Sequence, residues 1–143
     1  MPPTSPLTRY VGRAERTLQA LLERQIEPAG LSFPEWTILT FLGGGTLPRA
    51  YVIALVTSGR IATKEDAELV LDGLVEKGMV AIDAENVEMT ELGSRVYSPV
   101  RQKVDEIVQR LLDGLPAADM DVTRRTLDAI AARAEKLLSQ AAA

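Results

Sequence analysis

Residues 63–93, with the sequence TKEDAELVLDGLVEKGMVAIDAENVEMTELG, decide the fold of this chain. Thr63 is a favourable helix N-cap, and Asp66, three positions later, resembles the acid of a capping box. Gly78 ends the predicted helix because glycine adopts the left-handed C-cap conformation at little cost. Between them, the apolar residues recur at helical spacing: Ala67, Val70, Leu71, Leu74 and Val75.

Two short β-prone runs follow this helix, at residues 79–82 and 87–89. Residues 83–86, Asp-Ala-Glu-Asn, supply the turn between them. A helix followed by such a hairpin is the reading half of a winged helix-turn-helix. We therefore predict a mainly α fold with a small β-wing.

Three further helices are predicted upstream of this stretch. The first covers residues 7–26, where apolar residues alternate in steps of four and three and form a heptad seam. The second is opened by a capping box of Ser32 and Glu35 and is stopped by three glycines at 43–45. The third is short, starts at Leu47-Pro48 and ends at Ser58-Gly59, so it forms a helix-turn-helix with the helix at Thr63.

Two long helices are predicted downstream of the wing. One runs from Thr90 to about Leu115, and Pro99 either kinks it or marks its true start with Ser98 as the cap. The other covers residues 118–140. Its heptad seam is formed by Leu127, Ile130, Ala134 and Leu137.

These elements predict how the chain is organised. Residues 1–143 are expected to form a single winged-helix domain, with the winged helix-turn-helix core at 31–90. Residues 1–30 and 91–143 are expected to be dimerisation helices that come from both termini. One small core cannot bury three apolar seams, so we predict that a second copy covers them and that the protein is a homodimer.

Composition narrows the classes of function. The chain has 46% hydrophobic and 25% charged residues, as soluble globular proteins do, and it has neither Cys nor His. It therefore lacks thiol chemistry, the commonest metal ligand and the commonest general base, and we expect no metal and no cofactor. Glu35 is the one carboxylate we consider as a catalytic candidate, and its capping role already accounts for it. We found no recognisable catalytic motif, so the sequence favours a protein that is not an enzyme.

Location is predicted from two features of the sequence. No apolar run approaches the ~18–20 residues that span a bilayer, so no association with a membrane is expected. The first residues, MPPTSPLTR, lack the basic and apolar regions of a signal peptide. We therefore expect a cytoplasmic protein.

The order of these elements resembles the MarR (multiple antibiotic resistance regulator) family of winged-helix transcription factors. The resemblance covers nearly the whole chain and rests on LSFPEW at 31–36, LDGLVEKGMV at 71–80 and MTELG at 89–93. It implies a dimer whose recognition helices enter successive major grooves of DNA while the wings touch the flanking minor grooves. It also implies that a small anionic aromatic ligand binds between the dimer helices and the reading head and releases DNA.

The predicted reading head departs from the family in its charge. The family usually presents small or hydroxyl residues and an Arg from the recognition helix, where this chain has Glu68 and Leu69. The wing is short and lacks the family's arginine. From Arg60 to Thr90 there are three basic and eight acidic residues, a net charge of −5, against −4 for the whole chain. Such a surface opposes contact with phosphate, although acids in the first helical turn also stabilise the helix dipole.

Two sets of candidate site residues follow. The nearby side chains that could contact DNA are Arg49, Arg60, Thr63, Lys64 and Lys77. The residues that could line the family's ligand pocket are Tyr10, Arg13, Phe33, Trp36 and Tyr51. For Phe33 and Trp36 the competing interpretation is a place in the core, and for Tyr10 and Arg13 it is a solvated helix face.

Three functions therefore stay open. The first is a homodimeric transcriptional regulator of the MarR type that responds to a small-molecule ligand. The second is a repurposed protein with the same fold that no longer binds DNA and instead binds, sequesters or transforms a small apolar molecule. The third is a protein-binding module whose acidic head mimics DNA or docks on a basic partner.

Overall fold

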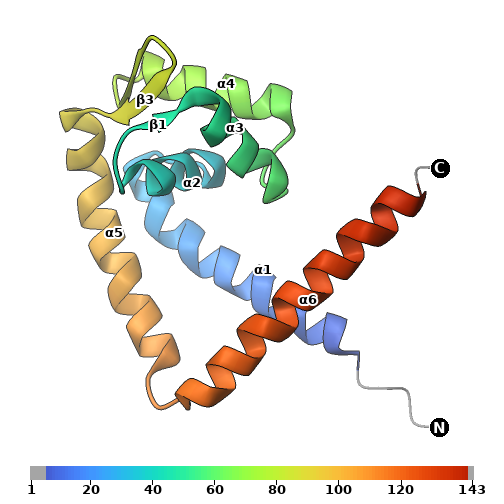
Figure 1. Ribbon diagram of the computed structural model, residues 1–143. Coiled ribbons are helices and arrows are strands. Elements are labelled where there is room, and N and C mark those ends of the chain that lie inside the picture. Colours follow the sequence, from blue (N-terminus) through green and yellow to red (C-terminus); the bar gives the residue numbers. More distant parts are fainter. Residues whose placement is uncertain (1–5, 142–143) are drawn as a thin grey trace, which may run out of the picture. The chain divides into compact units, whose positions relative to one another are not determined.

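The computed structural model describes residues 6–141, and Figure 1 shows the course of its elements. The first part of the chain contains α1 (Leu7–Ile26), the 3-10 turn η1 (Glu27–Ala29), α2 (Phe33–Leu42), β1 (Leu47–Pro48) and α3 (Arg49–Ser58). It continues with α4 (Lys64–Glu76), β2 (Val80–Asp83), β3 (Asn86–Met89), α5 (Glu91–Leu112) and α6 (Ala117–Ala141). This order confirms the predicted winged-helix class.

The chain divides into two compact units. The first extends to Glu106 and holds the winged helix with α1 and most of α5, while the second starts at Ile107 and holds the end of α5 and all of α6. The helices found within residues 6–141 include none that is long and apolar enough to cross a bilayer.

The start of α2 forms as predicted. The Ser32 hydroxyl accepts a hydrogen bond from the Glu35 amide at 3.3 Å, and the Glu35 carboxylate accepts one from the Ser32 amide at 2.9 Å. This reciprocal capping box satisfies two backbone N–H groups that a helix start leaves unpaired.

Helix α4 is also capped as predicted. The Thr63 hydroxyl accepts from the Asp66 amide at 3.2 Å, and Glu65 and Asp66 lie in the first turn, where the helix dipole favours acids. At the other end Gly78 takes a φ of 76°, the left-handed conformation that stops the helix.

The wing has one strand more than the sequence indicated. We predicted that Leu47-Pro48 would start a helix, but the structure corrects this: Leu47 pairs with Val87 and Pro48 with Asn86, so the strand order within residues 6–141 is β1-β3-β2. Proline disfavours a helical conformation in the residue before it and provides no amide hydrogen, which suits a short edge strand. Helix α3 therefore begins at Arg49, whose N–H donates to the Glu85 carbonyl of the wing turn at 2.7 Å.

The core of the winged helix is a single apolar cluster. It is centred on α2, α3, α4 and the wing, and α1 and α5 close it through Ile26 and Tyr97. Its least exposed large side chains are Ile26, Ile38, Leu39, Leu71, Leu74, Val52, Val56, Val80 and Val87.

The long helices differ from the prediction mainly in their ends. Helix α5 starts at Glu91 and runs through Pro99, which is exposed, so Pro99 does not mark its start. It ends at Leu112 rather than near Leu115, and α6 begins at Ala117.

The side chains of helix α6 are almost all exposed to solvent. In the second unit, its residues up to 140 are exposed except Met120 and Ile130, which are half-buried. Within the second unit, its predicted seam therefore finds little cover.

Candidate functional site

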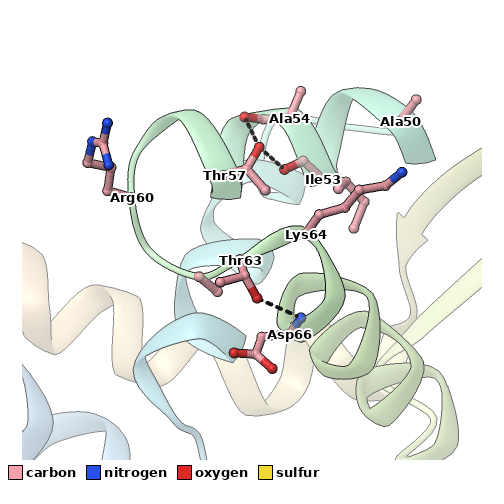
Figure 2. Close-up of a pocket in the computed structure, with 9 residues that line it drawn as sticks. Ala50, Ile53, Ala54, Thr57, Arg60, Thr63, Lys64 and Asp66 are labelled. Atoms are coloured by element: carbon pink, nitrogen blue, oxygen red, sulfur yellow. Dashed lines mark hydrogen bonds between the residues drawn. The ribbon is translucent and has the colours of Figure 1, made fainter. Parts of the chain in front are cut away.

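The two helices of the helix-turn-helix, α3 and α4, border an open cleft of about 800 Å³. Its walls are mostly small and apolar on the α3 side, whereas the turn and the start of α4 add polar groups. Figure 2 shows Lys64 reaching from the start of α4 to the side of Ala50, while Arg60 stands at the opposite end of the cleft. The lining residues are Ala50, Ile53, Ala54, Thr57, Arg60, Ala62, Thr63, Lys64 and Asp66.

Hydroxyl groups of this cleft already have partners. The Thr57 hydroxyl donates within α3 to the Ile53 carbonyl at 3.1 Å and to the Ala54 carbonyl at 3.2 Å (Figure 2). The Thr63 hydroxyl is the cap of α4. Thr63, which we predicted as a DNA contact, therefore also has a structural role.

Three of the predicted DNA contacts surround the helix-turn-helix. Arg60 lies in the turn with a φ of 57°, Lys64 is the first residue of α4, and Arg49 is the first residue of α3. Arg60 and Lys64 are exposed and Arg49 is half-buried. These cations therefore sit at the ends of helices and in the turn, not along α4.

The solvent-facing side of α4 has a different character. Ala67, Leu71 and Leu74 face the core, and the opposite side of the helix presents Glu65, Leu69, Asp72 and Glu76, which we call the outer row. Leu69 is 68% exposed, more than any other large hydrophobic residue in the described part of the chain. The outer row thus presents three negatively charged side chains, which repel phosphate groups, and one apolar side chain.

The wing continues this acidic character. Strands β2 and β3 are joined by the two residues Ala84 and Glu85, and Ala84 takes a φ of 56°. The carboxylate-bearing residues of the hairpin, Asp83, Glu85 and Glu88, are exposed. A wing of this composition repels the backbone of the minor groove instead of neutralising it.

Lys77 lies at the end of α4 and is engaged elsewhere. Its ammonium Nζ donates to Oε2 of Glu35 at 2.6 Å, and the side chains are 45% and 11% exposed, respectively. The pair joins the candidate DNA contact Lys77 to the catalytic candidate Glu35, which sequence reasoning did not connect. Forty-two residues separate them, so no local spacing could have indicated the contact.

The surroundings of Glu35 keep its side chain in the ionised form. Burial alone would raise the pKa of this carboxyl, but the hydrogen bonds from Lys77 and Ser32, together with the charge of Lys77, outweigh burial and lower the pKa. A carboxylate held ionised in this way suits ion pairing and is a poor proton donor.

The five predicted ligand residues come from α1, α2 and α3 and differ in their exposure. Trp36 is 5% exposed and belongs to the core, where its ring lies 4.9 Å from that of Tyr97, and Phe33 is half-buried. Tyr10 and Arg13 are exposed on α1, and Tyr51 is exposed on α3. The competing interpretation of Trp36 as a core residue therefore holds in the single chain.

Sequence reasoning did not connect Tyr97 with Arg101. These two residues are one helical turn apart on α5, a spacing that could have indicated the contact. Burial would lower the pKa of Arg101, but Tyr97 and Asp105 outweigh it and raise the pKa, and Arg101 Nε lies 3.0 Å from the Asp105 carboxylate. Among the described residues, no group of acids is placed to hold a metal ion.

Comparisons with known proteins identify the fold. No model of a protein family matches the chain, and no curated protein matches it. Solved structures do: ligand-free NadR has a TM-score of 0.76 at 18% identity, covering 93% of this chain and 98% of that one. CouR from Rhodococcus jostii, bound to p-coumaroyl-CoA, has a TM-score of 0.72 at 20% identity and coverages of 90% and 93%.

A MarR-family protein of Mycobacterium tuberculosis, solved in complex with DNA, has a TM-score of 0.67 at 23% identity, covering 88% of this chain and 98% of that one. At such identities the similarity establishes the fold. This chain has the winged-helix fold of MarR-family proteins, as its sequence predicted.

Proposed function

We propose that this chain is a homodimeric transcriptional regulator of the MarR type that responds to a small molecule. The observation that carries the proposal is the similarity of fold over about nine-tenths of the chain, terminal helices included. Similar structures were solved with p-coumaroyl-CoA, with 4-hydroxyphenylacetate and with DNA. Those molecules belong to those proteins, and they support a ligand site and a DNA site as general features of the fold.

The homodimer is supported by apolar side chains that the single chain leaves exposed. They recur along α1, the end of α5 and α6, at the spacing of a helix that needs a partner. They include Leu7, Leu18, Val108, Leu111, Leu112, Val122, Leu127, Leu137 and Leu138. A second copy of the chain that packs on these faces would remove their apolar side chains from water, which is favourable.

In the regulator, DNA contacts come from the cations around the helix-turn-helix. Arg49 and Lys64 reach phosphates from the first residues of α3 and α4, and Arg60 does so from the turn between these helices. Lys77 is paired with Glu35. Because the outer row of α4 opposes phosphate, the affinity is modest and salt-sensitive. Tyr10 and Arg13 on α1 offer a phenol and a cation to an anionic ligand, and we propose that the dimer brings Phe33, Trp36 and Tyr51 into its surroundings.

A second candidate function is favoured by the outer row itself. Glu65, Asp72 and Glu76 occupy the face of α4 that would enter a major groove, and the acidic wing flanks it. Under this alternative the dimer keeps its ligand site and has lost its affinity for DNA.

One experiment separates the two. The purified protein is titrated against a labelled duplex from the region flanking its own coding sequence, at low and at moderate salt, with a scrambled duplex as control. Regulator function predicts a shift at low salt that weakens as salt rises and that Arg60→Ala reduces. Absence of any shift at low salt would overturn it in favour of the second candidate.

A further inference from the structure

The two oxygens of the Glu35 carboxylate have partners in different parts of the winged helix. Oε1 accepts from the Ser32 amide at 2.9 Å, and Oε2 accepts from the Lys77 ammonium at 2.6 Å. The side chain is 11% exposed. A single, largely buried group therefore bridges two segments that are far apart in sequence.

One of these segments is the connection between α1 and α2. After α1 the chain passes through η1, the Leu31 amide donates to the Ile26 carbonyl at 3.2 Å, and Ser32 then caps α2. We call residues 27–32 the α1–α2 joint. This joint is the covalent connection between α1 and α2.

The other segment is the last turn of α4. The Lys77 amide donates to the Gly73 carbonyl at 3.0 Å, and the residue is the C-cap of α4. A cation at this position also suits the negative end of the helix dipole. Lys77 therefore fixes the end of α4 that lies opposite its Thr63 cap.

We propose that Glu35 and Lys77 are positioning residues that tie the α1–α2 joint to the end of the recognition helix, so that a movement of α1 is passed to α4. The mechanical link stands on the geometry alone. Its use in controlling DNA binding rests on the proposed function.

The ion pairs along α5 lack this reach. Arg95 pairs with Glu91 and Arg101 with Asp105, each one turn along α5. Such pairs restrain one helix only and are exposed to solvent, where they contribute little. The Glu35 carboxylate is largely withdrawn from water, so the loss of one partner leaves a charge that the site cannot solvate well.

The link can be tested by amide hydrogen exchange in the full-length protein. Lys77→Met removes the ammonium and keeps most of the apolar stem, and the half-exposed position makes correct folding the expected result. Glu35→Gln is the reciprocal variant. Arg95→Met is the matched control because it breaks an ion pair confined to α5.

If the link is present, a substitution at Lys77 should also affect residues outside α4. Lys77→Met raises exchange of the Ser32 amide and of the last turn of α4 by about tenfold, while Arg95→Met changes neither. The fluorescence of Trp36, the single tryptophan of the chain and the sequence neighbour of Glu35, shifts in Lys77→Met and does not shift in Arg95→Met. If the effect of Lys77→Met stays within α4 and the Ser32 amide and Trp36 are unchanged, the proposal is wrong.

The regulatory step is measured separately by DNA titration of the same variants. Distant exchange effects without any DNA binding by the wild type would refute the proposed function and leave the link intact. DNA binding by the wild type without distant exchange effects would refute the link and leave the function intact.

Discussion

Gly93, at the start of α5, has no room for a β-carbon. A β-carbon built there would collide with the Met79 carbonyl oxygen and come within 2.9 Å of Met89 Cγ. Backbone atoms of the wing cannot move aside without breaking the hydrogen bond from the Thr90 amide to the Met79 carbonyl. We therefore expect Gly93→Ala to lower the free energy of unfolding by about 3 kcal/mol or more, measured by urea denaturation.

A second glycine provides the matched control. A β-carbon at Gly73, inside α4, would have no neighbour within 4 Å, so Gly73→Ala should stabilise the protein by about 0.5–1 kcal/mol through helix propensity. Equal destabilisation by both substitutions would contradict the assigned cause.

The Glu35–Lys77 pair gives a dependence of stability on pH. The pKa of Glu35 is lower in the folded protein than in the unfolded chain, so acid protonates the unfolded chain first. The contribution of Glu35, about 1–2 kcal/mol after allowing for the exposure of Lys77, is complete above the ordinary carboxyl pKa and is lost as pH falls through the lowered pKa.

Urea denaturation of the wild type and of Glu35→Gln at a series of pH values checks this. The difference in unfolding free energy should be largest near neutrality and shrink towards acid. Glu91→Gln, at a side chain 86% exposed, should show no such trend. A constant difference across the series would argue against an ionised Glu35 in the folded state.

Under the proposed function, we expect the outer row of α4 to control how strongly this helix binds DNA. Replacing Glu65 and Asp72 by lysine converts two repulsive charges into two possible phosphate contacts. We expect Glu65→Lys/Asp72→Lys to raise affinity for a random duplex at low salt by about tenfold, with a steeper dependence on salt. Fluorescence anisotropy measures both quantities.

The control for this prediction carries the same change in net charge. Glu15→Lys/Glu27→Lys alters exposed residues on α1 and η1. If it raises DNA affinity as much as the α4 variant does, the effect reflects net charge and the outer row has no special position.

The prediction of elements succeeded where the signal was local. Helix α1, the capping box of α2 and the Thr63 cap of α4 each depend on residues close together in the sequence, and the structure confirms them. Strand β1 was missed because a strand of two residues exists only through its pairing with β3. The Glu35–Lys77 contact was missed for the same reason. It forms because α2 packs on α4, and the spacing of apolar residues along the sequence does not show which helices pack together.

At the scale of the whole molecule, the exposed side chains of α6 demand an explanation. A helix of 25 residues with two half-buried side chains gains little from packing, and isolated helices are marginal in water. The sequence predicted this seam, and the second unit by itself leaves it uncovered. Under the proposed homodimer, we expect the stability of α6 to come from association with a second copy.

Leu127→Glu tests this directly, since it places a charge in the middle of the seam. If a second copy covers Leu127, the charge is buried without a partner, and the dimer should weaken by at least about a hundredfold in dissociation constant. Sedimentation at several concentrations measures the dimer, and circular dichroism measures the helix content, which should fall on dissociation. Ala132→Glu adds the same charge about 140° around the helix and should leave both unchanged. A wild-type protein that is monomeric at high concentration and keeps its full helix content would contradict the homodimer and leave α6 to be stabilised within one chain.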